Sequence, residues 1–187
     1  MIWKAQLLLI LFVCCNLLGR AQETLVFDDK FKFIENKGQW PDFVLFRAET
    51  NYGKIYVEQG RILYQFLDLN DIHATHAKVK DEVFKGEPQV KQELISLEFV
   101  NAQKVDRIQK TKEAPEYYNY FLGNDKSRWA GRVKSYADVI LEEIYPGIDL
   151  HYNNSGDFLK YEFIVAPGAN PNGIVMRYHN AKSVKVN

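Results

Sequence analysis

The residues of this sequence that could carry chemistry are few and widely separated. His73 and His76 stand three positions apart, a spacing that can chelate a metal ion from one face of a helix. The other histidines, His151 and His179, lie far away in the sequence, and both cysteines fall within residues 1–21. Since the third and fourth ligands are missing, the pattern favours a solvated loop over a metal site.

Three acids could supply the pair of carboxylates that a glycoside hydrolase needs, namely Glu142, Glu143 and Asp149. Alternation along a strand would send the two glutamates to opposite faces. Asn124 and Asp125, together with Asp149, could instead bind calcium through oxygen ligands, but an Asn-Asp pair after glycine is typical of a turn. The sequence also lacks a nucleophile elbow and a glycine-rich phosphate loop. We therefore expect no catalytic residue and no cofactor, with calcium as the open alternative.

Aromatic residues make up 14% of the chain, and a group of them surrounds one turn near the middle. Tyr117, Tyr118 and Trp129 could form a ligand face, because aromatic rings stack on sugar rings. A sandwich core uses the same residue types, and alternation would bury either Tyr118 with Tyr120 or Tyr117 with Phe121. Core packing and carbohydrate binding both remain open for this group.

The elements that must position these side chains are β-strands, because apolar residues alternate with period two along most of the chain. Turn-forming residues separate the expected strands, and residues 59–60 and 153–157 read as hairpin connections. The polar segment 68–92 is expected to be a long connection with one helical turn near residues 80–84. Many short strands predict an all-β fold, an antiparallel, jelly-roll-like β-sandwich with little helix. Strands are expected at residues 44–48, 54–58, 61–67, 94–100, 133–136, 139–144, 149–152, 159–165 and 174–178.

The N-terminus differs in kind from the rest of the chain. Residues 1–21 combine one early lysine, an apolar run and small residues before Gln22, which predicts a signal peptide cleaved near Ala21. A membrane anchor is the alternative, but the run is shorter than the roughly 20 residues of a spanning helix. We expect residues 22–32 to be an extension and residues 33–187 to form the β-sandwich domain of a secreted or cell-surface protein.

Charge and composition exclude several partners and classes. The chain has 24 basic and 24 acidic residues, so no overall positive field attracts nucleic acid. With 47% hydrophobic and 26% charged residues it has the usage of a globular domain. Residues 183–186 read as the opening of another strand, so we expect a domain truncated at its C-terminal end. A short frayed terminal strand is the alternative.

Four motifs, in order, resemble an uncharacterised N-terminal domain found in large secreted proteins of Bacteroidota-type bacteria. They are FIENKGQW at 33–40, NYFLGND at 119–125 with Trp129, YPGIDL at 145–150 and KYEFIVAPGANP at 160–171. The resemblance implies a domain without assigned activity that precedes SBBP-type propeller repeats, PKD or other immunoglobulin-like modules. It also implies a C-terminal sorting tail for type IX secretion or gliding-motility-associated export. Residues 1–187 include none of those modules and no such tail, and Asn170 stands where the resemblance implies an acid.

Physically, these motifs read as turns and anchors of the fold. The fold-defining residues are expected to be Trp40, Gly123, Asn124, Asp125, Pro146, Gly147, Asp149, Pro167 and Gly168. We accordingly expect Gly123→Val or Trp129→Ala to unfold the domain. The leading hypothesis is a non-catalytic extracellular module for assembly, adhesion or display, whose partners are downstream modules or surface proteins. A carbohydrate-binding or glycan-processing domain and a nonfunctional fragment are the alternatives.

Overall fold

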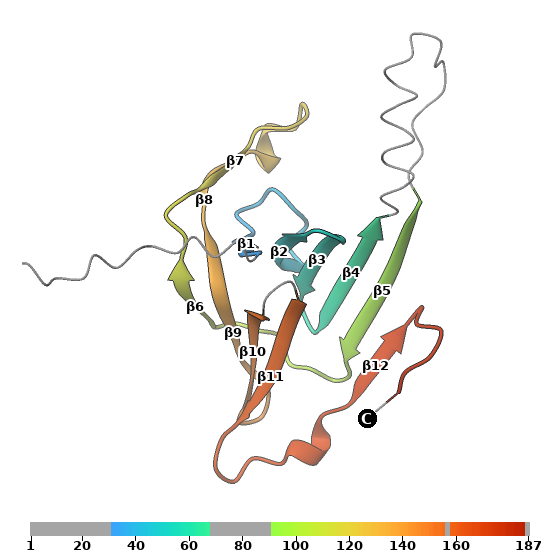
Figure 1. Cartoon of the computed structure of the whole chain (residues 1–187). Helices are drawn as coiled ribbons and strands as arrows, with labels where there is room; N and C mark the ends of the chain where they lie inside the picture. Colours follow the sequence, from blue (N-terminus) through green and yellow to red (C-terminus); the bar gives the residue numbers. More distant parts are fainter. Residues whose placement is uncertain (1–30, 68–90, 156–157, 186–187) are drawn as a thin grey trace, which may run out of the picture.

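The computed structural model describes residues 31–67, 91–155 and 158–185 (Figure 1). The predicted signal peptide and the segment that contains His73 and His76 lie outside the described residues. The strands are β1 (Phe33–Glu35), β2 (Val44–Thr50), β3 (Gly53–Glu58), β4 (Arg61–Leu67), β5 (Gln92–Phe99), β6 (Ile108–Glu113), β7 (Tyr118–Tyr120), β8 (Ala130–Val133), β9 (Ser135–Tyr145), β10 (Ile148–Ser155), β11 (Phe158–Val165) and β12 (Met176–His179). Two 3₁₀ helices, η1 (Lys126–Arg128) and η2 (Pro171–Gly173), complete the described elements.

Most strands belong to one antiparallel sheet that curls on itself. Its order is β11-β10-β9-β1-β2-β3-β4-β5-β12, β6 pairs with β9, and β7 and β8 form a separate pair. Figure 1 shows β9, β10 and β11 on one side and β3, β4 and β5 on the other. The predicted all-β fold is confirmed, and the facing layers are parts of a continuous sheet.

The main core lies between these two parts of the sheet, as the period-two pattern requires. Val139 and Leu141 of β9 and Leu150 of β10 are fully buried in it. The rings of Phe99 on β5 and Phe163 on β11 pack edge to face, with their centres 5.8 Å apart. This contact joins the two parts of the sheet. Each fully buried side chain of this kind stabilises the fold by about 1.5–3 kcal/mol.

The turn motifs lie at the ends of strands. Tyr145 stands opposite Ile148 across a two-residue turn, in which Gly147 has φ +69°. The N–H of Ala166 donates to the carbonyl of Gly147 at 2.9 Å, so this turn also anchors the segment that follows β11. Gly168 has φ +86° in the next turn. These glycines set the path of the chain in the turn between β9 and β10 and in the segment after β11.

The structure differs from the sequence prediction at the C-terminal end. Residues 183–185 form no strand, and residue 186 lies outside the described part. Asn180 has φ +61°, which ends β12, and residues 180–183 then line a hollow together with residues 92–95. Strands β1, β6, β7 and most of β8 were not predicted. Three of them have only three or four residues, and β6 has a single apolar residue, Ile108. Among the described residues, no helix has the length and apolar character needed to cross a membrane.

Candidate functional site

A two-stranded ribbon stands away from the main sheet, and we call residues 117–133 the arm (Figure 1). Its strands pair antiparallel, with Tyr118 opposite Val133 and Tyr120 opposite Ala130. The connecting residues 121–129 contain η1. Because an isolated two-stranded ribbon is at best marginally stable in water, the arm requires packing against the body.

The arm rests on the outer face of β1 and β2. Alternation sends Phe33 of β1 into the main core and its neighbour Ile34 to the opposite face. A second hydrophobic cluster forms there around Ile34, Ala130 and Val133, with Trp40, Tyr118 and Tyr120 packed against it. The base of the arm is therefore held by a small core of its own.

Arg47 is the polar centre of this second cluster. It pairs with Ile34 across β1 and β2, so its side chain also points to the outer face. Its guanidinium lies 4.4 Å from the ring centre of Trp40 and 5.7 Å from that of Tyr120. An ion pair of 2.6 Å with Glu49 balances its charge. Cation–π contacts of this type contribute about 0.5–2 kcal/mol each and orient the rings around the guanidinium.

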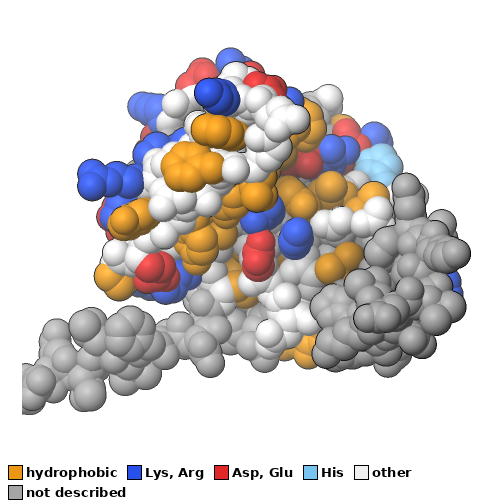
Figure 2. Space-filling model, turned by 90° about the horizontal axis from the view of Figure 1, so that it is seen from above, with side chains coloured by type: hydrophobic (Ala, Val, Ile, Leu, Met, Phe, Trp, Pro, Cys, Tyr) orange, Lys and Arg blue, Asp and Glu red, His pale blue; other side chains and the backbone are white. Residues whose placement is uncertain are grey.

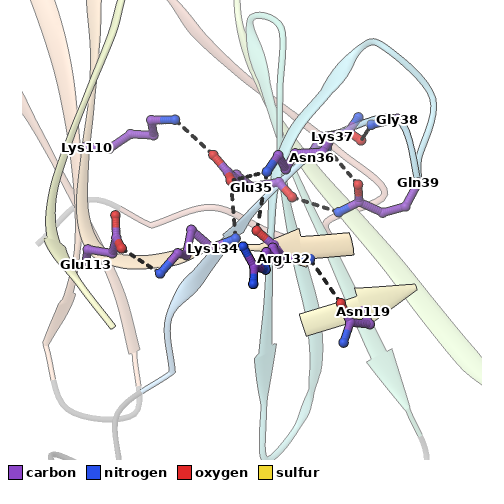
Figure 3. Close-up of polar contacts among 10 residues, drawn as sticks. All are labelled: Glu35, Asn36, Lys37, Gly38, Gln39, Lys110, Glu113, Asn119, Arg132 and Lys134. Carbon is purple, nitrogen blue, oxygen red and sulfur yellow. Dashed lines mark hydrogen bonds and ion pairs between the residues drawn. The ribbon is translucent and has the colours of Figure 1, made fainter. Parts of the chain in front are cut away.

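A polar network fixes the other side of the arm's base (Figure 3). Glu35, the last residue of β1, accepts a hydrogen bond from the N–H of Lys134 at 3.2 Å and pairs with Lys110 at 2.9 Å. Burial acts to lower the pKa of Lys110, but the hydrogen bond and charge of Glu35 prevail and raise it. Lys134 in turn pairs with Glu113 at 2.8 Å. One carboxylate thus ties β1, β6 and the junction of β8 with β9 together.

The loop after β1 is held by its own side chains. The Asn36 carboxamide oxygen accepts from the N–H groups of Gly38 and Trp40, and its nitrogen donates to the Val44 carbonyl at 2.8 Å. The Gln39 side chain accepts from Lys37 N–H at 2.7 Å and donates to the carbonyl of residue 35, also at 2.7 Å. The FIENKGQW motif therefore builds the loop that presents Trp40 to the arm.

The far end of the arm is apolar and exposed. Leu122 is 79% exposed and Phe121 is 57% exposed, whereas Tyr117 is exposed at the other end of the ribbon, next to the pair of Tyr118 with Val133. Trp129 donates its indole N–H to the Gly123 carbonyl at 3.2 Å. The rings of Trp129 and Phe121 pack edge to face, with their centres 5.8 Å apart. Figure 2 shows apolar side chains gathered on the face seen from above, with lysine and arginine side chains among them.

A short cap holds the turn at this tip. Asp125 accepts hydrogen bonds from the hydroxyl and the N–H of Ser127 at 2.6 and 3.0 Å. These bonds lower the pKa of Asp125, the hydroxyl contributing most. Gly123 has φ +72° and Asn124 is exposed beside it. The FLGND motif thus forms a capped, exposed turn and does not enter the core.

The structure separates the three residues of the predicted ligand face. Tyr117 and Trp129 are exposed on the arm, whereas Tyr118 is half-buried and stacks with Tyr120 at 6.5 Å in the second cluster. Trp129 is also not a buried anchor, and a Cβ at Gly123 would meet no atom within 4 Å. Gly123→Val and Trp129→Ala would therefore remove no buried contact of the main core, and the expected unfolding stays a prediction.

The acids considered for catalysis are engaged in structural contacts. Glu142 pairs with Arg107 at 2.9 Å, and Asp149 accepts from the N–H of Glu143 at 2.8 Å. Glu143 has φ +52° at an irregularity in the pairing of β9 with β10, so Asp149 caps a β-bulge. Within the described residues, no three His, Cys, Asp or Glu side chains gather to hold a metal ion.

Sequence reasoning missed Glu35 and Arg47, which organise the base of the arm. Arg47 stands between two apolar residues, and Glu35 follows an apolar residue at the end of a short strand; ordinary solvent-facing positions share both patterns. The outer-face position of Arg47 could be predicted from alternation. Its aromatic partners, Trp40 and Tyr120, could not, because they come from distant parts of the chain.

Comparison with known families places residues 33–187 in one match, to a domain of unknown function, DUF7948. The chain belongs to the DUF7948 family. The match covers both the curled sheet and the arm, so they are parts of one family domain. Comparisons with curated proteins and with solved structures found no match.

Proposed function

We propose that this DUF7948 chain is a non-catalytic interaction module of a larger secreted or cell-surface protein, used for assembly, adhesion or display. The observation that carries the proposal is the exposed apolar tip, with Phe121 and Leu122, on an arm whose base is firmly seated. Large apolar side chains that gather on a protruding element mark interaction surfaces. The arm would serve as the contact surface, and the curled sheet as its support.

The contacts of the acidic residues support a non-catalytic role. A general acid or base needs a carboxyl group free to face a substrate. Glu142 is bound by Arg107 and also accepts from Gln109 at 2.8 Å, and Asp149 faces a backbone N–H. Glu58, which is buried, binds Arg61 at 2.7 Å. Each of these carboxylates stabilises a strand or a turn.

The contacts of the aromatic rings on the arm disfavour a sugar platform. Sugar recognition usually stacks a pyranose ring on an open aromatic face. At Trp129 the ammonium of Lys126 lies 5.7 Å from the ring centre, and the ring of Phe121 packs nearby. The rings of Tyr118 and Tyr120 stack on each other, so these two faces are not open to a sugar. Carbohydrate binding is therefore the alternative that a binding test must distinguish.

Export is part of the same proposal. Residues 1–21 would direct secretion and be removed near Ala21, and the domain would join downstream modules or surface proteins. Removal would also take both cysteines, so the exported domain would depend on core packing and not on disulfides. The second hydrophobic cluster at the base of the arm suits such a role, because the contact surface must keep its shape without a disulfide.

The test compares tip variants with a matched variant elsewhere. The full chain carrying Phe121→Ser and Leu122→Ser should lose its association with the surface of the producing cells. The measurement is the fraction of the protein that stays bound to the cells and is accessible to added protease. Phe158→Ser, at a residue 69% exposed in β11, should keep it. Equal retention of all variants would contradict the proposal. Saccharide binding on a glycan array that Tyr117→Ala abolishes would favour the alternative, and insolubility of the wild-type chain would indicate a nonfunctional fragment.

A further inference from the structure

We infer that the arm docks on a lipid surface that carries anionic phosphate headgroups, with its apolar tip inserted between them. This inference rests on the proposed function and gives the arm's partner a chemical class. Three observations carry it: the local charge of the arm, the position of the apolar residues at its far end, and the arrangement of cations around Trp129.

The arm is cationic within a chain that is neutral as a whole. Residues 117–133 contain the basic residues Lys126, Arg128 and Arg132, and their one acid is Asp125. Asp125 is turned toward Ser127 and lies 3.8 Å from Arg128, so it weakens the field of one cation only. A cluster of cations beside a bilayer attracts anionic lipid, and each one strengthens the attraction.

The base of the arm adds to this positive surface. Lys37 donates from its ammonium to the backbone carbonyl of Arg132 at 3.3 Å, and the Glu35 carboxylate, 3.9 Å from that ammonium, partly balances its charge (Figure 3). Arg132 has φ +52°, and its N–H donates to the side chain of Asn119 at 3.0 Å. Its guanidinium makes no ion pair with any described residue. The left-handed turn therefore places an uncompensated cation at an exposed position.

The order of side chains along the arm matches the layers of a bilayer surface. Leu122 and Phe121 lie at the far end of a protruding turn, and Lys126 and Arg128 follow within η1. Trp129 lies behind the tip, with its indole N–H bonded and the Lys126 ammonium near its ring. Tryptophan and basic residues prefer the headgroup region, while leucine and phenylalanine prefer the hydrocarbon beneath it.

A protein partner would require different geometry. Hot spots of protein interfaces are anchors that fill a pocket on the partner. Contacts around them exclude water from that pocket. Here the apolar side chains project from a narrow turn with charges immediately behind them. A fluid lipid surface accommodates such a convex tip without a preformed pocket, whereas a protein partner would become evident as an outcome of the test.

The experiment measures binding of the full chain to vesicles. Sedimentation with phosphatidylcholine vesicles is compared with vesicles that contain about 30 mol % phosphatidylglycerol, at about 0.05 M and 0.5 M salt. We expect binding only with the anionic lipid, weakened by salt, together with a blue shift of the Trp fluorescence. All samples carry Trp3→Phe, because Trp3 lies in the apolar segment 1–21, and the blue shift should then disappear in Trp129→Phe. Trp40 serves as the internal reference, because it is held at the base of the arm.

Matched variants separate charge from insertion. Lys126→Gln with Arg128→Gln should weaken vesicle binding by about 25-fold, while Lys104→Gln with Lys182→Gln on the body should change it less than about twofold. Phe121→Ser should weaken binding by about tenfold, and Phe158→Ser should not. Circular dichroism melts confirm that each variant is folded.

The outcomes distinguish this inference from the proposed function. Absence of wild-type binding, or binding that ignores the anionic lipid or the arm variants, overturns the lipid inference. If the tip variants nevertheless abolish association with cells, the proposed function stands and the partner is not lipid. If neither vesicles nor cells respond to the arm variants, both fail.

Discussion

Gly53 and Gly123 form a matched pair for testing which parts of this molecule determine its fold. Both have positive φ, +143° and +72°. A Cβ at Gly53 would lie 1.9 Å from the carbonyl oxygen of Gln65 on the neighbouring strand β4, whereas one at Gly123 would meet nothing within 4 Å. The same substitution to alanine therefore meets a fixed backbone at one site and open space at the other.

The expected losses of stability differ accordingly. Gly123→Ala carries only the strain of a left-handed residue, about 1–2 kcal/mol, which for this chain length lowers the Tm by about 2–8 °C. Gly53→Ala must also displace β4, where Gly53 stands opposite Phe66. We expect a loss of about 4 kcal/mol or more, in the range of the most damaging point substitutions, and a Tm lower by about 8–16 °C.

Thermal denaturation followed by circular dichroism measures both variants, and urea titration at one temperature gives the free energies of unfolding. Ala48→Gly, at a buried strand residue, gives a reference for an ordinary loss within the same sheet. A Gly123→Ala variant as unstable as Gly53→Ala would refute the reasoning, because it would show that the tip of the arm is part of the folding core.

Three further predictions concern polar groups. Within the described residues the buried Tyr152 hydroxyl has no hydrogen-bond partner, so Tyr152→Phe should raise the free energy of unfolding in urea by about 1 kcal/mol; a loss would contradict this. Burial, followed by a hydrogen bond that the Tyr161 hydroxyl donates to Tyr178, raises the pKa of Tyr161 to about 12 from 10.0, so stability is complete below pH 10 and falls as the pH rises toward 12. Tyr161→Phe should flatten that fall in urea titrations across this range, and an unchanged slope would contradict the assignment. Glu35→Gln weakens the tie to Lys110, so hydrogen exchange of the arm's amides should quicken while β9 and β10 stay protected; unchanged exchange would show that the second cluster alone holds the arm.

The strands that form the main core could be predicted because each of them has one buried face. Val139 and Leu141 alternate with half-buried or exposed residues in β9, and the same alternation marks Leu150 and Tyr152 in β10. Turns were readable from Gly and Pro, since few other residues adopt the required dihedral angles. These signals depend only on neighbours in the chain.

The arm could not be predicted in the same way. Tyr117, Tyr118, Phe121 and Trp129 are chemically alike, and local pattern gave no reason to send one into a cluster and another into solvent. Which ring is buried depends on Arg47, whose guanidinium packs over the rings of Trp40 and Tyr120, from different parts of the chain. The exposure of the FLGND turn likewise follows from the direction in which the seated arm points.

Composition and periodicity by themselves determined that this chain builds an antiparallel β-domain with turns at its glycines and prolines, because half-buried strands impose a local period of two. Only the tertiary structure decided that the sheet is continuous and curled, that Glu35 and Arg47 hold an arm against its outer face, and that the aromatic motif ends in an exposed tip. Those features depend on contacts between residues far apart in sequence, and such contacts leave no periodic signal along the chain.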